Sequence, residues 1–483
     1  MLKNKKEKFS EWYSEVIQKA ELADLRYNVR GFLVHRWWAV DIMKRMFDAY
    51  EKELDRTGHK EFWVPHVIPE ANLKKEAEHA KGFSPQVFWI EKAGAERKRL
   101  EEPLVMRPTS ETAMYTMYSL WIRSWRDLPF KRYQSGVVFR YEAQTRPFLR
   151  GREFYWIEAH DVFATKEGAE AQVKEDIQMT ENIMHRQFGI PFIFFRRPKW
   201  DTFAGAERTY AADTMNPDGK SLQQPSTHFL GQNFARAFNV KFKDKDEKEQ
   251  FAWQTCYGPA IWRMIASLIA LHGDDKGLVL PFNLAPYQIV IVPIVFKGKE
   301  KNVLSTCRKV AQQISKAGYR AHVDDRDEYT AGSKFFDWEI RGVPLRIEIG
   351  PKDLVKKQVI CVLRHSGKKQ SVKTVDLIKY VKKIEPMVLD YLRKQADTLL
   401  KNSMREAKTF SQLESEIKKG GFVRVNWCSV TADGEPCAER IEKDLLARVR
   451  GIRVDKKEKP KTGAKCVICG KPAKHIVYVA KQY

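Results

Sequence analysis

Long hydrophobic runs are missing from this sequence of 483 residues. The longest apolar stretch, Ile289–Phe296, is far shorter than the roughly 18 residues of a membrane helix and has the length of a strand. The first residues, Met1–Glu7, contain no hydrophobic signal core. Internal repeats and long low-complexity segments are also missing. These absences argue against membrane, secreted and repeat proteins, and we expect a cytoplasmic protein that binds no membrane.

Cysteine is scarce, and so is negative charge relative to positive charge. Seven cysteines without a secretory signal favour reduced thiols or metal ligands over disulfides. Lysine and arginine number 86 against 62 acidic residues, which gives a formal charge of +24. Such a charge is typical of proteins that bind a polyanion, most often nucleic acid, although a merely soluble basic surface is the alternative. The length predicts two to four domains.

Charged and aromatic residues recur at a period of two in one central stretch, which predicts two antiparallel strands at 133–142 and 152–163. One strand would carry Arg140 and Glu142, and the loop after it carries Arg146 and Arg150. The facing strand would carry four further side chains, namely Phe154, Trp156, Glu158 and His160. A solvated, salt-bridged hairpin is the alternative. Arginine forks match phosphate oxygens, so the convergence favours a site for a polyphosphate, a purine and an amino acid.

The flanking regions divide into further elements. Apolar spacing over 32–54 predicts a helix that ends at Gly58, and 62–65 reads as a strand that closes on a proline. Strands and helices then alternate to about residue 272, with a hairpin turn at 241–249. After a proline-bounded linker at 280–286, β-α-β units are predicted from strands 289–295, 321–324 and 345–349 and a helix near 299–317.

Four cysteines gather near the end of the chain, at Cys428, Cys437, Cys466 and Cys469. The last two form a CxxC knuckle, which by itself would also suit a redox pair. The two further cysteines favour a tetrahedral Cys₄ zinc site. Because such a closed set leaves no open coordination position, the metal is expected to be structural.

Several motifs resemble those of a known family. The stretch from Phe139 to His160 resembles motif 2 of the class II aminoacyl-tRNA synthetases, and 107–112 (Arg-Pro-Thr-Ser-Glu-Thr) resembles the substrate loop of the prolyl enzymes. Further matching segments are 76–83, 227–234, 272–278, 342–351 and 463–466. Together they resemble prolyl-tRNA synthetases of the archaeal and eukaryotic type over roughly residues 10–483. The resemblance implies an α+β fold with an antiparallel-sheet catalytic domain (1–284), an α/β anticodon-binding domain (285–386) and a small zinc-binding C-terminal domain (387–483).

By this resemblance the chain would use ATP and Mg²⁺ to activate L-proline and charge tRNA(Pro). Arg140 would bind the α-phosphate, and Arg263 would be the motif 3 arginine, so both count as catalytic. The segment from Gly258 to Arg263 is one residue longer than the usual pattern and contains Pro259. The other implied ATP contacts are Glu142, Arg150, Arg152, Phe154, Gln223 and Ser226.

The implied proline contacts begin with Thr109 and Glu111, which would hold the amino group. The rest of that set is Arg140, Trp156, Glu158, His160 and His228. Taken alone, either histidine fits a structural role, and Cys256 fits a buried packing role. These positions favour proline over the threonyl and histidyl enzymes of the same subgroup; a non-catalytic RNA-binding paralogue is the alternative from another class.

Two further implications concern RNA and assembly. Arg346 and Glu348, with the acidic and basic side chains at 324–326, would read the anticodon. The helix at 32–54 and the strand after it resemble motif 1, which implies a homodimer. About 90 residues separate His160 from Gln254, and the catalytic core needs them, so we expect no inserted editing domain there.

Overall fold

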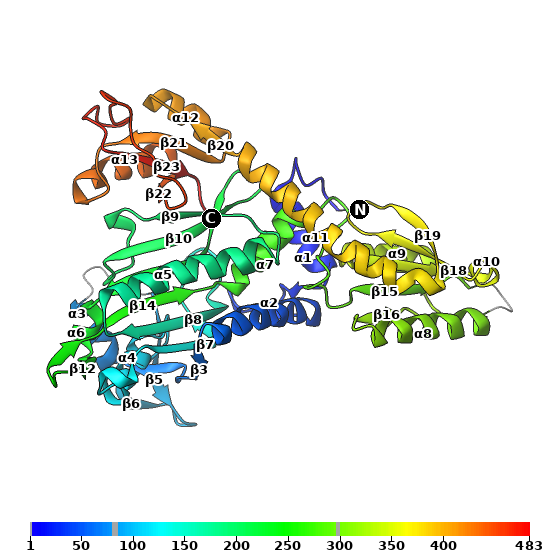
Figure 1. Ribbon diagram of the computed structural model, residues 1–483, viewed down its shortest axis with the longest axis horizontal. Coiled ribbons are helices and arrows are strands. Elements are labelled where there is room, and N and C mark those ends of the chain that lie inside the picture. Colours follow the sequence, from blue (N-terminus) through cyan, green and yellow to red (C-terminus); the bar gives the residue numbers. More distant parts are fainter. Residues whose placement is uncertain (1, 80–85, 296–299) are drawn as a thin grey trace.

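The computed structural model describes residues 2–79, 86–295 and 300–483. Within them, Figure 1 shows a large body of helices and strands and a smaller lobe at one end. Gly82 and Phe83, from the segment expected to match the family at 76–83, lie outside the described residues. None of the helices in these ranges combines the length and apolarity required for a membrane span.

An eleven-stranded sheet forms the body. Its order is β20 (Met404–Glu406), β21 (Phe422–Trp427), β23 (His475–Ala480), β22 (Arg448–Arg453), β9 (Ile193–Arg196), β10 (Arg208–Met215), β11 (Ser221–Gly231), β14 (Trp253–Gly258), β8 (Glu153–Phe163), β7 (Phe130–Phe139) and β3 (Lys60–Glu61). All neighbours run antiparallel except the two edge pairs, β20–β21 and β3–β7. The mostly antiparallel sheet matches the predicted α+β class.

The hairpin of β7 and β8 confirms the predicted antiparallel pair, since Phe130 faces Val162 and Phe139 faces Glu153. The prediction that the first strand continues to 142 is wrong. Strand β7 ends at Phe139, although the amide of Arg140 still donates to the carbonyl of Arg152 at 2.9 Å. The chain then turns away, because the amide of Tyr141 donates to Gln86. Arg140 therefore makes the last backbone bond after the strand, and Glu142 lies in the loop beyond it, where the alternation that a ladder imposes no longer applies.

Three helices pack in layers against this sheet. Both α5 (Lys166–Thr180) and α7 (Ile261–His272) pack on its central strands, and α2 (Trp37–Arg56) packs on α7. The helix expected at 32–54 begins later because Arg36 is extended, and it ends before Gly58, whose φ of +89° is left-handed. The strand expected at 62–65 is wrong: the ladder with β7 is confined to β3, and the amide of Val64 donates to the Gln134 side chain instead.

Smaller elements complete the body. They are α1 (Phe9–Lys19), β1 (Ala23–Asp24), β2 (Val34–His35), α3 (Glu70–His79), α4 (Glu111–Trp121), α6 (Asn233–Ala237) and a three-stranded sheet of β4 (Val67–Pro69), β6 (Lys98–Met106) and β5 (Phe88–Ala93). The predicted hairpin near 241–249 is confirmed as β12 (Lys241–Lys243) and β13 (Glu249–Phe251).

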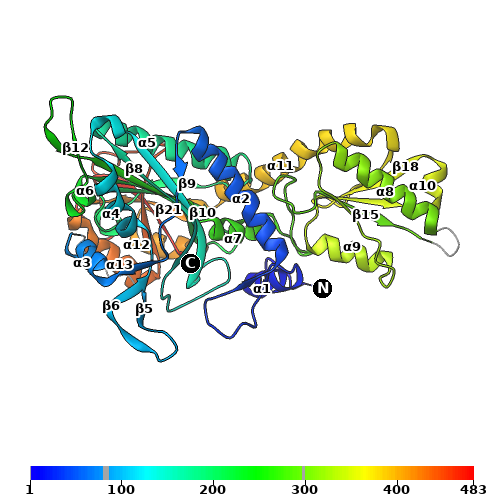
Figure 2. The ribbon, with the colours of Figure 1, turned by 90° about the horizontal axis from the view of Figure 1, so that it is seen from below.

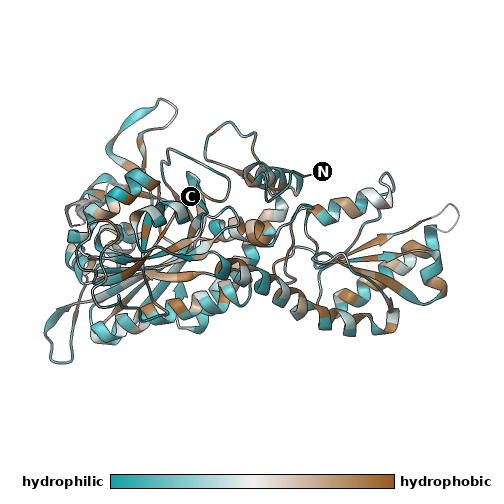
Figure 3. Cartoon of the chain, turned by 90° about the horizontal axis from the view of Figure 1, so that it is seen from above, coloured by the Kyte–Doolittle hydropathy of each residue, from teal (hydrophilic) through white to brown (hydrophobic). Residues whose placement is uncertain are grey.

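The end lobe contains a five-stranded sheet in the order β16 (Ala321–Val323), β15 (Ile289–Pro293), β17 (Leu345–Ile349), β18 (Gln358–Leu363) and β19 (Lys369–Lys373). The first three strands are parallel, which confirms the predicted β-α-β units. Three helices belong to this lobe, namely α8 (Glu300–Lys316), α9 (Ala331–Ile340) and α10 (Pro351–Val355). Apolar colour follows its strands in Figure 3, and β15 is buried throughout.

A long helix, α11 (Leu377–Asn402), runs from the end lobe back to the body, as Figure 2 also shows. It leads into the C-terminal part, where α12 (Phe410–Lys418) and α13 (Glu435–Leu445) pack on β21 and β22. Strand β22 pairs with β9 through Ile452 and Arg453. The C-terminal strands therefore extend the central sheet, so the last part of the chain shares a hydrogen-bonded framework with the strands that carry the candidate site.

Candidate functional site

Arg140 lies where β7 ends, against the aromatic face of β8. Its Nε donates to the carbonyl of Pro108 at 3.0 Å, and its guanidinium lies 5.1 Å from the Phe154 ring centre and 5.4 Å from that of Trp156. Burial lowers the pKa of Arg140, while the carboxylates of Glu158 and Glu111 oppose that shift. Arginine keeps its charge under such shifts, so Arg140 is a fixed cation. It lies between the two halves of the site, which are a cluster of further arginines and a pocket of carboxylates.

A second group of charges surrounds the loop after Arg140. The Glu142 carboxylate lies 3.4 Å from Nη1 of Arg150, and Arg152 Nε donates to the backbone oxygen of Glu142 at 3.1 Å. Arg152 also lies over the ring of Tyr141, 4.1 Å from its centre. Nη2 of Arg150 donates to the backbone oxygen of Tyr483 at 3.2 Å, so the end of the chain reaches this loop.

Arg263 joins the same cluster from α7. Its Nη1 donates to the backbone oxygen of Gln223 at 3.2 Å. Burial lowers its pKa to about 10, and the positive charges of Arg140 and Arg150 add to that shift. Although the segment before it is longer than the family pattern, β14 ends at Gly258 and α7 begins at Ile261, so two residues form the connection. Three guanidiniums near one another create a site that favours a polyanion.

A buried acidic pocket lies on the other side of Arg140. Thr109 Oγ1 is 2.7 Å from Oε1 of Glu158 and also hydrogen-bonds Glu111. Glu158 also accepts hydrogen bonds from the Ser110 amide, at 3.0 Å, and from the Ser110 hydroxyl. Two buried carboxylates this close together favour a cation between them. Burial acts to raise the pKa of Glu158, but His160, the charge of Arg107 and the Ser110 hydrogen bond together lower it. Burial acts to lower the pKa of His160, but Glu111 and Glu158 raise it.

The two halves meet in a cavity of about 320 Å³ lined by Gln86, Pro108, Thr109, Arg140, Tyr141, Glu142 and Phe203. His228 lies at the Phe203 side, with ring centres 4.8 Å apart. Burial, helped by the charge of His160, lowers the pKa of His228 to about 3, so its imidazole is neutral. Ser226, expected near the ribose, forms a hydrogen bond between its Oγ and Nε2 of His228, 3.1 Å apart.

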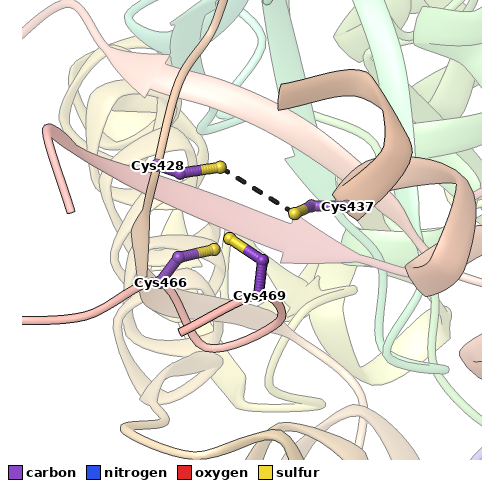
Figure 4. Close-up of side chains that lie close together, drawn as sticks. All are labelled: Cys428, Cys437, Cys466 and Cys469. Carbon is purple, nitrogen blue, oxygen red and sulfur yellow. Dashed lines mark hydrogen bonds between the residues drawn. The ribbon is translucent and has the colours of Figure 1, made fainter. Parts of the chain in front are cut away.

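The four C-terminal cysteines converge, as Figure 4 shows. Cys428 follows β21, Cys437 lies on α13, and the other two lie in the loop before β23. All four sulfurs lie within 4.8 Å of one another, and those of Cys428 and Cys437 are 3.8 Å apart. Two sulfurs bound about 2.3 Å from one tetrahedral zinc would be separated by about 3.8 Å. The donor set and spacing therefore fit a closed zinc site.

Sequence comparisons agree with this arrangement. Residues 88–272 match the model of the class II tRNA synthetase core domain (G, H, P, S and T), 288–384 that of the anticodon binding domain, and 410–483 that of the prolyl-tRNA synthetase C-terminal domain. Proline–tRNA ligase of Thermofilum pendens is 50% identical, covering 99% of this chain and 98% of the relative. The Thermococcus kodakarensis ligase is 40% identical with the same coverage. The chain belongs to the prolyl-tRNA synthetases.

Solved prolyl-tRNA synthetases share the fold. That of Giardia lamblia in complex with prolyl-adenylate superimposes with a TM-score of 0.94 at 34% identity, covering 100% of this chain and 99% of that one. The Cryptosporidium parvum enzyme, complexed with halofuginone and AMPPNP, gives 0.92 at 31% identity, covering 100% and 97%. The predicted family, fold class and enzyme class are thus confirmed.

Some residues of this synthetase site were not expected to contribute to it from the sequence, although Arg107 opens the segment that resembles the substrate loop. Phe203 follows a short 3-10 turn, and Tyr115 on α4 places its hydroxyl 2.9 Å from Nδ1 of His160. Arg107 is fully buried and donates to the carbonyls of Val64 and Val137. Cys256, expected to be a packing residue, lies in the acidic pocket with its sulfur 3.7 Å from Glu111 Oε1. These contacts join positions far apart in sequence, which a local pattern does not record.

In the end lobe, the residues expected to read the anticodon are paired with each other. Arg346 Nη2 donates to Glu348 Oε1 at 2.9 Å, and Lys369 Nζ lies 3.2 Å from Oε2 of the same carboxylate. The guanidinium of Arg346 also lies over Phe335, 4.1 Å from the ring centre. Arg326, in the neighbouring acidic segment, is held by Asp324 and Asp337. A nucleobase that binds here would have to compete with these ion pairs.

Proposed function

We propose that this synthetase activates L-proline with ATP to prolyl-adenylate and transfers the prolyl group to the 3′-end of tRNA(Pro). The observation that carries the proposal is Arg140, whose guanidinium stands between a pocket of buried carboxylates and a cluster of arginines. A cationic amine suits the first, and a triphosphate suits the second. This activity is the one that the relatives are named for. The carboxylate pocket and the arginine cluster supply the charged groups that it requires.

On the proline side, Thr109, Glu111, Glu158 and His160 would hold the secondary ammonium. Trp156 and His228 would enclose the ring, as would Phe203 beside them. An ammonium there would place a positive charge between the carboxylates of Glu111 and Glu158, which both lie within hydrogen-bond distance of the Thr109 hydroxyl. The neutral state of His228 is compatible with an apolar ring.

On the ATP side, Arg140 would bind the α-phosphate, and Arg263 would bind from the opposite face. Glu142 would accept the adenine amino group, with Arg150 and Arg152 on the outer phosphates and Phe154 stacked on the base. Gln223 and Ser226 would lie nearer the ribose. Mg²⁺ would enter with ATP and would stabilise phosphate charge.

The reaction requires position and charge rather than a covalent nucleophile. The proline carboxylate attacks the α-phosphorus and expels pyrophosphate, and a terminal ribose hydroxyl of the tRNA then attacks the mixed anhydride. Arg140 and Arg263 would stabilise charge that develops on the phosphoryl oxygens. Arg140 would also fix the proline carboxylate next to its target, since it contacts both halves.

We also propose the domain limits and the remaining assignments. The catalytic domain spans 1–284, the anticodon-binding domain 285–386 with Arg346 and Glu348 as readers, and the C-terminal domain 387–483 with structural zinc on its four cysteines. The seven cysteines are all free of disulfides, which supports action in a reducing compartment, the cytoplasm. The charge of +24 supports binding to tRNA.

A homodimer through the outer side of α2 and the segment after β3 completes the proposal. Trp63 there is 79% exposed, and Leu120 and Trp121 at the end of α4 are about half exposed. Phe62 connects Trp63 with the end of α4, because its ring centre lies 5.9 Å from that of Trp121. Exposed aromatic side chains of this kind are typical of protein interfaces. Sedimentation equilibrium should give a mass of two chains for the wild-type protein. The Trp63→Glu variant should have the mass of a single chain.

One assay tests the enzymatic proposal. Pyrophosphate exchange is measured with each of the twenty amino acids, with and without tRNA. We expect strong exchange with proline and weak exchange with alanine, both without tRNA. Exchange that responds to threonine or histidine would instead place the chain with another enzyme of the subgroup. Binding of tRNA without any exchange would indicate the non-catalytic paralogue.

A further inference from the structure

Three potential metal ligands meet at the base of the proposed proline pocket. They are Glu111 at the start of α4, His160 on β8 and Cys256 on β14, and one ligand atom of each lies within 4.8 Å of the others. The Cys256 sulfur is 3.7 Å from Glu111 Oε1 and 3.9 Å from His160 Nε2. All three side chains are buried. Carboxylate, imidazole and thiol thus converge without any role for the thiol in the proposed reaction.

The separations fit one ion. A tetrahedral zinc with a sulfur at about 2.3 Å and nitrogen or oxygen ligands near 2.1 Å has ligand-to-ligand edges of about 3.6 Å. The Tyr115 hydroxyl lies 2.9 Å from Nδ1 of His160, so it can hold the tautomer that leaves Nε2 free to bind a metal. A second carboxylate is close as well, because Oε1 of Glu158 lies 3.8 Å from Nε2 of His160. The cluster therefore needs little movement to accept a metal.

The charge of the pocket favours a cation as well. Glu111 and Glu158 share the single hydroxyl of Thr109. Glu158 also accepts from the Ser110 amide and hydroxyl, so the two carboxylates are held in place for a cation. In the proposed function that cation is the proline ammonium. We infer, on the basis of that proposed function, that the same pocket binds a thiophilic divalent cation of the Zn²⁺ type through Glu111, His160 and Cys256, and that this ion and proline exclude each other.

The ligand types determine which ion can bind. Thiolate and imidazole favour Zn²⁺ and Co²⁺ over Mg²⁺ and Ca²⁺, which prefer oxygen ligands. On binding, the thiol proton of Cys256 and any proton on Nε2 of His160 pass to solvent, and the metal forms bonds to sulfur and nitrogen. No electron is transferred. Three protein ligands leave a fourth position open, unlike the closed four-cysteine set.

Co²⁺ is the probe, because cobalt–thiolate bonds absorb in the near ultraviolet. The holoenzyme is used with its four-cysteine site loaded with zinc, and ATP is left out so that nucleotide does not bind the metal. We expect the absorption to saturate at one added cobalt per chain and to disappear as proline is titrated. Cys256→Ser should lose the absorption and bind cobalt at least tenfold more weakly. Cys307→Ser, a buried cysteine of the end lobe, is the matched control and should keep it.

Each outcome decides one statement. No cobalt uptake beyond the four-cysteine site, or absorption that persists in Cys256→Ser, overturns the inference. Absorption that depends on Cys256 but resists proline would support the metal site and refute the proposed proline pocket. Glu111→Gln provides a second variant in case Cys256→Ser does not fold: weaker cobalt binding with an unchanged thermal transition supports the site, and unchanged binding overturns it.

Discussion

A buried arginine from the C-terminal part should be critical for the stability of the body. The Asp213 carboxylate on β10 is wholly inaccessible. It accepts two hydrogen bonds from Arg197, both 2.8 Å long, and two from Arg450 of β22, at 2.8 and 3.0 Å. Burial acts to raise the pKa of Asp213, but the two guanidiniums lower it to about 2. Nη2 of Arg197 also donates to Gln223 at 3.1 Å, so the network reaches the proposed ATP site.

We predict that Arg450→Met destabilises the protein by about 3 kcal/mol. Removal of one partner from a buried ion pair costs about 3–5 kcal/mol. The lower end applies because Arg197 keeps both bonds to Asp213, and methionine fills much of the space. For a folding unit of 150–250 residues, each kcal/mol lowers the melting temperature by about 2–4 °C. The melting temperature should therefore fall by about 6–12 °C. Because the network reaches Gln223 in the proposed ATP site, the KM for ATP should rise by a larger factor than kcat falls.

Differential scanning calorimetry checks this prediction, with Arg448→Met as the control. Arg448 lies on the same strand, but its partner Glu442 is 56% exposed, and such pairs contribute about 0.2–1 kcal/mol. Because the folded pKa of Asp213 is depressed, its stabilisation is present above its ordinary pKa of 3.8 and is lost as the pH falls through about 2. The difference between wild type and Arg450→Met should thus persist from pH 8 to pH 5. Equal melting temperatures for the two variants would refute the reasoning.

Four further predictions concern chemistry, metal, pH and fidelity. Arg140→Ala should lower proline-dependent pyrophosphate exchange at least about 100-fold, as loss of about 3 kcal/mol of charge stabilisation implies, whereas Arg126→Ala on the surface should not; retention of a tenth of the rate contradicts the assignment. Elemental analysis should find one tightly held zinc per chain, absent from the double variant Cys466→Ser/Cys469→Ser, which should melt at lower temperature. Burial raises the pKa of Asp176 to about 7, and the charge of Asp161 adds to the shift. The free energy of unfolding should therefore fall by about 4 kcal/mol on account of this group as the pH rises from about 4 to 7. Urea titrations of Asp176→Asn at several pH values should lack this dependence. Finally, the enzyme should activate alanine measurably, because a smaller ligand loses only about 1–3 kcal/mol of contact, and alanyl-tRNA(Pro) should hydrolyse in its presence no faster than spontaneously.

The sequence by itself determined the elements whose signals are local. The period-two pattern predicted the hairpin of β7 and β8, and alternating apolar runs predicted the β-α-β units of the end lobe. The CxxC knuckle and the two cysteines before it predicted the whole four-cysteine cluster, because two residues of separation place the first pair of sulfurs on one turn and the other two lie in the same short module. Motif spacing identified the family. In each case the information lies within a few residues, where backbone geometry links side chains directly.

The tertiary structure alone decided which distant groups share a site. It took Arg140 and Glu142 out of the strand, because the backbone of Tyr141 bonds to Gln86 rather than to β8. It also joined β22 to β9 and placed Arg450 beside Asp213, 237 residues earlier in the chain. A buried carboxylate requires compensating charge from whichever strand packs next to it, and only the paired sheet specifies that strand. For the same reason the thiol of Cys256 reads as packing in the sequence and becomes a potential ligand only in the fold.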